Sequence, residues 1–261
     1  PDPQAPAGGL SASILDYSRW MRMQLGEGRF EGETIVSPEA LGETWRPHSQ
    51  SAYNPETHEA SYYGLGWGVG RDPELGLKLS HSGAFTLGTR TVVNLFPDVD
   101  LGIAVAVNAG SNGVPEAITM AFEDLLTRGD LRHDWIEFAD EKFLEMESDF
   151  TAYEVDLADR PVDPEPASEA QRYTGTYSNE YFGPLKVAAE GEALQMTLGP
   201  EPKVFPLSHW DGDTFLFQPV GENAGGPGAV VFRRVGDSGA GSVHIPYFDG
   251  EGMGTFVRSG E

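Results

Sequence analysis

Cysteine is absent from this chain of 261 residues. Its absence excludes disulfide bonds, thiolate zinc sites and a cysteine nucleophile, but it does not distinguish a reducing from an oxidising compartment. Basic residues are scarce, since 17 Lys and Arg stand against 41 Asp and Glu and leave a formal net charge of −24. A field of this sign repels phosphate backbones and anionic lipids, so we expect no nucleic-acid partner. The sequence also lacks the apolar run of roughly 20 residues that a membrane span requires.

The chain starts without methionine and without a basic and apolar leader, and its first residues, PDPQAPAGG, are typical of a loop. We therefore expect a piece of a longer protein. Acidic residues gather between Asp134 and Glu169, which hold 13 of the 41 acids. We interpret this segment as a solvated surface, with a docking face for a basic partner as the alternative.

Start signals for helices occur in the first half of the chain. Ser13, three residues before Asp16, has the form of a capping box, and apolar residues recur at helical spacing after it. Ser37-Pro38-Glu39 repeats the start signal. The predicted helices span 14–25, 38–45, 115–128 and about 134–153, and the third carries Ile118, Phe122 and Leu125 on one face.

Short strands are predicted between the second and third helices. Residues 46–61 have the composition of an irregular loop, and strands follow over 62–70, 77–83, 89–97 and 101–108. Pro97-Asp98 is typical of a tight turn, so the last two strands should pair antiparallel. The run Ile103 to Val107 is apolar on both faces, which predicts a central strand.

A composition change marks a domain boundary. Residues 156–170 are acidic, rich in proline and almost free of large apolar groups, as linkers are. We expect a first domain over 1–155 and a second over 171–261. Eight short apolar segments separated by Gly or Asp turns predict that the second domain is all-β, a small barrel or half-barrel. The expected fold class is α+β.

Several kinds of site lack their motif. The six histidines show no HxxxH or HExxH spacing on a predicted helix, so we predict no metal. No P-loop and no GxGxxG is present, and we predict no cofactor. The GxSxG elbow of the α/β-hydrolases is missing as well.

One ordered set of segments carries a resemblance: PAGGLSASILDYSRWMRMQL, then YYGLGWGV, then HSGAFTLGTRTVVNLFPDVDLGIAVAVN. This order resembles the last third of the catalytic domain of β-lactamase-related serine hydrolases, which include class C β-lactamases, penicillin-binding proteins, D-aminopeptidases and related esterases. The later stretches YTGTYSNEYFGPLKV and PLSHWDGDTFLF are similar to the β-domain often appended to that family. The resemblance implies the last part of a β-lactamase-like antiparallel sheet with packed helices, followed by an accessory domain.

The resemblance implies a site around His81-Ser82-Gly83, which stand where the family has Lys-Thr-Gly on a strand that lines the active site. Imidazole at this position can orient a hydroxyl or hold a substrate carboxylate, whereas a surface or structural histidine is the alternative. Gly83 would let substrate approach the strand. The backbone N–H of Ala84 is the candidate second oxyanion donor. Asn108 resembles an asparagine that contacts substrate in some relatives.

Two further patterns are interpreted as structural. Tyr177-Ser178-Asn179 imitates the family's Tyr-x-Asn motif, but it follows HSG in the chain and lies in the predicted β-domain, so we expect a strand end. The aromatic residues Tyr62, Tyr63 and Trp67 are expected to pack in the sheet rather than form a ligand cage.

The family's nucleophile motif, Ser-x-x-Lys, is missing. No serine lies three residues before Lys78, Lys142, Lys186 or Lys203. Because both side chains must share a helix face, we expect the chain alone to be inert and the nucleophile to lie on an absent N-terminal segment. A sheet with only its last strands would leave several hundred Å² of apolar surface uncovered, which forgoes about 10 kcal/mol. We therefore expect an N-terminal partner segment or self-association.

The expected function is the C-terminal segment of a serine hydrolase of β-lactamase, D-peptidase or esterase type, which cleaves a small amide, ester or peptide through a seryl acyl-enzyme. The resemblance alone implies a periplasmic or secreted location. A non-catalytic binding or interaction module on a hydrolase-derived scaffold is the alternative. The five tryptophans suggest a third hypothesis, a carbohydrate-binding protein. It ranks last because most of the tryptophans lie in or beside predicted helices.

Overall fold

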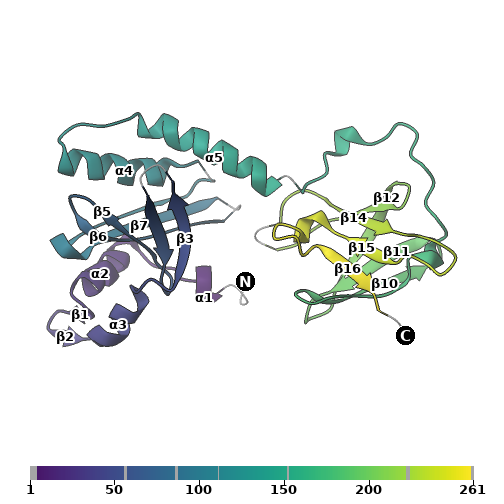
Figure 1. Ribbon diagram of the computed structural model, residues 1–261, viewed down its shortest axis with the longest axis horizontal. Helices are drawn as coiled ribbons and strands as arrows, with labels where there is room; N and C mark the ends of the chain where they lie inside the picture. Colours follow the sequence, from purple (N-terminus) through teal and green to yellow (C-terminus); the bar gives the residue numbers. More distant parts are fainter. Residues whose placement is uncertain are drawn as a thin grey trace. The chain divides into compact units, whose positions relative to one another are not determined.

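The computed structural model describes residues 5–55, 58–85, 88–110, 112–151, 153–221 and 224–259. The chain divides into two compact units, Pro1–Met146 and Glu147–Glu261. The first unit contains an antiparallel sheet with helices, and the second a closed β-barrel (Figure 1). The expected α+β fold class is confirmed, and the linker over 156–170 stays a prediction.

Two of the helices that precede the six-stranded sheet begin at their expected caps. Helix α2 (Ile14–Leu25) starts after Ser13, whose hydroxyl accepts a hydrogen bond from the Asp16 N–H at 3.2 Å. Helix α3 (Pro38–Thr44) starts after Ser37, whose hydroxyl accepts from the Ala40 N–H at 3.2 Å. Both starts follow from local cap chemistry. The same part of the chain holds α1 (Ala5–Gly8), β1 (Arg29–Phe30) and β2 (Glu33–Thr34).

Six antiparallel strands form the sheet of the first unit, in the order β3-β4-β5-β6-β7-β8. A short 3-10 helix, η2 (Pro97–Val99), and Asp100 at a φ of 51° make the predicted turn between the last two strands. The strands are β3 (Ser49–Asn54), β4 (Glu59–Tyr63), β5 (Gly68–Asp72), β6 (Gly76–Phe85), β7 (Thr89–Phe96) and β8 (Leu101–Val107).

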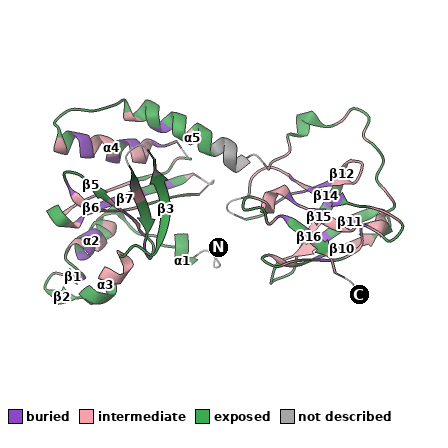
Figure 2. Ribbon diagram, in the orientation of Figure 1, coloured by how far each residue is buried: buried purple, intermediate pink, exposed green. Residues whose placement is uncertain are grey.

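Two expectations about this sheet are wrong. Residues 46–61 are not an irregular loop, because β3 and β4 pair there as a hairpin. The strand β3 lies at the sheet edge and is exposed (Figure 2). Its sequence therefore lacks the alternation of apolar and polar residues by which a half-buried strand is predicted. The run Ile103 to Val107 is not central, since β8 is the last strand of the sheet. It is apolar on both faces because both α2 and α4 (Val114–Thr127) contact β8.

Helices cover the two faces of the sheet, with α2 below it and α4 above it in Figure 1. Successive side chains of a strand point to opposite faces. Leu79 of β6 packs in a buried cluster with Met21 of α2, whereas its neighbour Lys78 bonds to Glu123 of α4. The side chain of each β6 residue can therefore be assigned to the α2 face or the α4 face.

The apolar stripe predicted on α4 does not face the sheet. Ile118 and Leu125 are 42% and 54% exposed, whereas Glu123 is buried. The strands under α4 present the cations Lys78 and Arg90 and the amide donor Asn94. Their partners are Glu116 and Glu123, so the acidic side of the helix faces the sheet. Helix α5 (Trp135–Thr151) follows, as expected for 134–153, and is largely exposed where its side chains are described (Figure 2).

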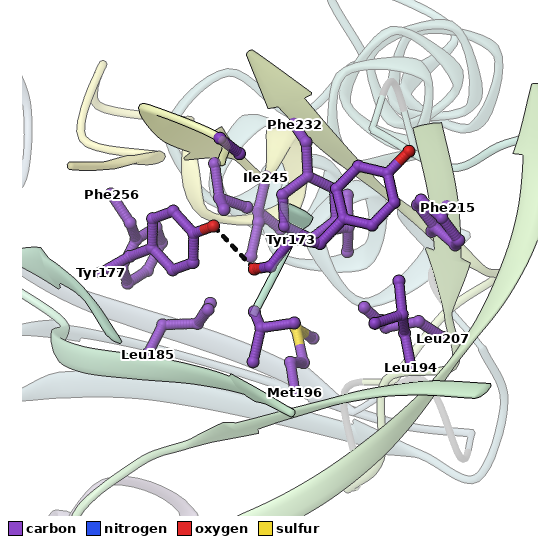
Figure 3. Close-up of a cluster of buried hydrophobic side chains, with 14 of the residues drawn as sticks. Tyr173, Tyr177, Leu185, Leu194, Met196, Leu207, Phe215, Phe232, Ile245 and Phe256 are labelled. Carbon is purple, nitrogen blue, oxygen red and sulfur yellow. Dashed lines mark hydrogen bonds between the residues drawn. The ribbon is translucent and has the colours of Figure 1, made fainter. Parts of the chain in front are cut away.

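The second unit is a closed barrel in the order β10-β11-β12-β13-β14-β15-β16-β9. Pairing of β16 with β9 closes it and rules out the half-barrel. Large side chains fill its interior (Figure 3), where the Tyr177 hydroxyl donates to the Tyr173 carbonyl at 2.7 Å. The strands are β9 (Gly175–Asn179), β10 (Gly183–Glu190), β11 (Ala193–Leu198), β12 (Lys203–Asp211), β13 (Thr214–Phe217), β14 (Gly228–Arg233), β15 (Ser242–His244) and β16 (Thr255–Arg258).

Within the described ranges, none of the helices has both the length and the apolar character required to cross a membrane.

Candidate active site

The candidate residues His81, Ser82 and Gly83 lie on β6, where the strand has only one neighbour. Strand β7 pairs with β6 from Leu79 to Phe85, but β5 pairs with it only from Gly76 to Ser80. In the part of the sheet that the structure describes, residues 81–85 therefore have a strand on one side only. We call this segment the β6 edge.

The turn after β6 determines which backbone groups point away from β7. The Phe85 carbonyl accepts a hydrogen bond from the Gly88 N–H at 3.0 Å, so the backbone polar groups of Phe85 point toward β7. Consecutive residues of a strand direct these groups to alternate sides. The N–H of Ala84 therefore points to the open side of the β6 edge. This is the direction that a second oxyanion donor needs, and that role stays a prediction.

The side chains of the candidate residues divide between the two faces. His81 is two residues from Leu79, so it shares the α2 face with Leu79 and with the Gly83 position, while Ser82 and Ala84 are directed to the other face. A Cβ atom added to Gly83 would meet no heavy atom within 4 Å. The His81 side chain therefore lies on the same face as the open space next to Gly83. The Ser82 hydroxyl is on the opposite face of the sheet.

His81 has an aromatic partner that its sequence neighbourhood does not reveal. The Nε2 atom of His81 lies 3.1 Å from the Tyr63 hydroxyl, and the two ring centroids are 6.4 Å apart at 56°. Tyr63 is the last residue of β4, 18 positions earlier in the chain. The pairing of β4, β5 and β6 places Tyr63 level with Ser80 across Gly68, and its hydroxyl reaches the neighbouring residue, His81. Spacing in the sequence therefore carries no signal for this contact.

The aromatic cluster near Tyr63 only partly packs as expected. Trp67 is buried and stacks on Trp20 with ring centroids 5.6 Å apart. Tyr62 and Tyr63 are 38% and 39% exposed. The expectation of sheet packing is confirmed for Trp67, and for the two partly exposed tyrosines it stays a prediction.

Asn108 lies directly after β8, at the same end of the sheet as the β6 edge. In the ladder, Phe85 is opposite Thr89, and Val107 is opposite Arg90, the next residue of β7. Asn108 is therefore level with Phe85, four positions beyond His81. Two strand spacings of about 4.8 Å separate it from β6. Contact between Asn108 and a substrate stays a prediction.

The Tyr177-Ser178-Asn179 pattern is structural, as expected. It forms the end of β9, and Tyr177 is fully buried in the barrel. The Asn179 amide donates to the carbonyls of Met253 and Thr255 at 2.6 and 2.9 Å. Among the described residues, no three His, Asp or Glu side chains gather as ligands for a metal ion.

Comparison with known families gives two matches. Residues 1–125 match the family model described as Beta-lactamase, and residues 159–254 match one described as a domain of unknown function, DUF3471. No curated protein matches the chain.

Three of the solved structures to which the chain is similar are as follows. The chain is similar to the C-terminal domain of penicillin binding protein Rv0907, with 33% identity over 40% of this chain and 98% of that one, at a TM-score of 0.35. It is similar to SurE, with 18% identity over 86% of this chain and 43% of that one, at a TM-score of 0.30. It is also similar to SurE with D-Leu, with 17% identity over 95% of this chain and 50% of that one, at 0.33. The chain spans half the length or less of the two SurE chains.

Proposed function

Because residues 1–125 belong to the β-lactamase family, we propose that this chain is the C-terminal portion of a serine hydrolase that cleaves an amide or ester bond. In this reaction a serine oxygen attacks the acyl carbon, the bond to the amine or alcohol breaks, and the leaving group takes up a proton. Water then releases the acid and regenerates the serine. The serine and its lysine activator are supplied by an N-terminal segment, since this chain contains no Ser-x-x-Lys.

The open β6 edge is the observation that carries the proposal. An extended substrate can add to an unpaired strand edge through main-chain hydrogen bonds. The Ala84 N–H points to that side, where it can donate to the oxygen that becomes negative during acyl transfer. His81 lies on the face where the space above Gly83 is open to a ligand. These groups can bind and polarise an acyl substrate, but they include no nucleophile.

Exposed apolar side chains of the first unit support an N-terminal polypeptide as the partner. Large contiguous apolar patches on soluble proteins often mark the surface that a partner covers. In this unit, side chains that are more than half exposed include Leu10, Ile14, Leu15, Ile35 and Leu65. We propose that the nucleophile-bearing segment covers such side chains, and self-association of the chain is the competing outcome. The periplasmic or secreted location belongs to this proposal and rests on the family alone.

The test compares the chain alone with the chain supplemented by the N-terminal segment encoded upstream of it. Chromogenic esters and a chromogenic cephalosporin serve as substrates. We expect no turnover by the chain alone and turnover after reconstitution, with a mass-detectable acyl adduct on a serine of the N-terminal segment. Turnover by the chain alone would refute the assignment of the nucleophile. No turnover after reconstitution would favour the non-catalytic binding module.

A variant of His81 tests the site itself. In the reconstituted enzyme, His81→Ala should lower kcat by about 100-fold or more, the usual scale for a lost transition-state donor. His48→Ala is the matched control, because His48 is an exposed histidine of the same unit whose Nε2 lies 3.2 Å from the Glu43 carbonyl oxygen. Equal rates for His81→Ala and His48→Ala would remove His81 from the site.

A further inference from the structure

We propose that Tyr63 is a positioning residue for His81, and that its hydroxyl holds the imidazole in the tautomer that carries the proton on Nδ1. The ring then acts as a hydrogen-bond donor to a substrate oxygen that is negatively charged, or becomes so during the reaction. The tautomer assignment rests on the Tyr63–His81 contact and on the chemistry of its two groups, whereas the role toward substrate rests on the proposed function.

The backbone of Tyr63 is held by neighbouring strands on both sides. Tyr63 pairs with Ser49 of β3 on one side and with Gly68 of β5 on the other, and its carbonyl accepts from the His48 N–H at 2.9 Å. His81 is held opposite Val93 of β7. Each ring is thus attached to a paired strand, so the 3.1 Å contact joins two anchored side chains.

The direction of the hydrogen bond follows from the chemistry of the two groups. A neutral imidazole has one N–H donor and one bare nitrogen acceptor, and a phenol can donate or accept. The bare nitrogen is a much stronger base than a phenol oxygen, and the phenol O–H is a stronger acid than the imidazole N–H. The favoured pair is therefore Tyr63 O–H donating to Nε2 of His81, which leaves the proton on Nδ1.

This tautomer restricts what His81 can do. With Nε2 already accepting from Tyr63, the ring offers the Nδ1–H group to a ligand and does not offer a free basic nitrogen. A donor of this kind suits a carboxylate or the oxyanion of an acyl group. The general-base role therefore does not fall to His81, in agreement with a nucleophile activated by another group.

The chain contains a second tyrosine–histidine pair that serves as an internal control. The Tyr53 hydroxyl lies 3.0 Å from Nδ1 of His58 at the end of the β3–β4 hairpin. Tyr53 is exposed, like Tyr63. Tyr53→Phe and Tyr63→Phe each remove a single hydroxyl from an exposed aromatic ring, so the two variants impose the same chemical change on different histidines.

The first experiment measures the tautomer directly in the 261-residue chain. Imidazole ¹⁵N chemical shifts are recorded at alkaline pH, where the rings are neutral, with the resonance of His81 assigned by its loss in His81→Ala. We expect the Nδ1–H form in the wild type and a shift toward the Nε2–H form, which free imidazole side chains prefer in water, in Tyr63→Phe. Tyr53→Phe should leave the His81 shifts unchanged. An Nε2–H form in the wild type, or equal shifts in Tyr63→Phe and the wild type, would overturn the proposal.

The second experiment uses the reconstituted enzyme. Tyr63→Phe should lower kcat/KM by about tenfold, as expected for the loss of one positioning hydrogen bond, and Tyr53→Phe should not. A tenfold loss without a tautomer change would assign Tyr63 another role and overturn the proposal. If the tautomer changes as expected but His81→Ala retains full activity, the positioning contact stands and the proposed function fails.

Discussion

Lys78 and Glu123 form an ion pair that joins strand β6 to helix α4. The Lys78 ammonium lies 2.7 Å and 2.9 Å from the two carboxylate oxygens of Glu123, and the Asn94 amide of β7 donates to the same carboxylate at 2.6 Å. The Glu123 side chain is only 9% exposed. Because Lys78 precedes His81 by three residues, the pair anchors the strand that carries the candidate site. Arg90 and Glu116 make a second such contact nearby.

Removal of Lys78 should destabilise the first unit. Lys78→Met leaves the Glu123 carboxylate buried without its cation, which we expect to cost about 3 kcal/mol of unfolding free energy. The double variant Lys78→Met/Glu123→Met should recover part of the loss, because both charges are then replaced by apolar groups while the buried Asn94 amide loses its acceptor. Urea unfolding measures all three free energies. Lys142→Met, which breaks an exposed pair with Glu145, is the control and should change nothing measurable. A double variant as unstable as the single one would contradict this account.

The core under α2 gives a second prediction. Leu79 is fully buried against Met21 and Trp67, so Leu79→Ala should lower the unfolding free energy by about 2–5 kcal/mol. Leu65 is 55% exposed in the same unit, and Leu65→Ala is the matched control. The comparison requires only urea unfolding of the two variants. Equal losses would mean that the cluster beneath His81 contributes little to the stability of the sheet.

Local signals in the sequence predict most of the elements. The helix starts at Ser13 and Ser37 follow from cap chemistry within three residues, and the eight barrel strands follow from their apolar segments and turns. The β3–β4 hairpin escapes prediction because an exposed edge leaves no apolar pattern. The inward face of α4 cannot be predicted locally either. The strands that it covers are distant in sequence, and their cations require the acidic side of the helix to face them.

The candidate site shows the same division between local and long-range information. His81-Ser82-Gly83 can be located from the sequence only through the family resemblance, and the structure places the motif on a strand, as expected. Tyr63 could not be found, because its contact with His81 depends on the register of three strands. The direction of the Ala84 N–H likewise depends on the turn at Gly88.

The buried carboxyl group of Asp124 should make the stability of the first unit depend on pH in the acid range. Its side chain is fully buried, and burial alone would raise its pKa. Hydrogen bonds from the Arg132 backbone at 2.9 Å, the Trp135 indole at 2.8 Å and the Arg132 guanidinium, with the charge of Arg132, outweigh burial and lower the pKa of Asp124 below its usual 3.8.

The sign of the pH effect follows from this shift. A carboxyl whose pKa is lowered by folding contributes stability above pH 3.8, and that contribution is lost as the pH falls through the folded value. Asp124→Asn should therefore flatten the loss of stability of the first unit below about pH 4 and should be less stable than the wild type at neutral pH. Asp130→Asn, at an exposed position, is the control. Parallel pH profiles for the wild type and Asp124→Asn, measured by urea unfolding, would refute the assignment.

The barrel should respond to alkaline pH through Tyr173. Burial, together with the hydrogen bond that the Tyr173 hydroxyl donates to Asp213 at 2.5 Å, raises the pKa of this phenol to about 12. In the unfolded chain the phenol ionises near 10.0. Above that pH the folded state binds the extra proton, so the contribution of Tyr173 to stability declines as the pH rises from 10.0 toward 12.

Tyr173→Phe separates this contribution from general alkaline damage. The variant should lose stability less steeply above pH 10.0 than the wild type does, and its phenolate absorbance titration should lack one late-ionising tyrosine. Tyr181, which is 72% exposed on the same barrel, provides the control Tyr181→Phe, which should retain the steep decline. Urea unfolding across this pH range measures the slopes. If Tyr173→Phe and Tyr181→Phe decline equally, the alkaline sensitivity of the barrel originates from groups other than the Tyr173–Asp213 pair.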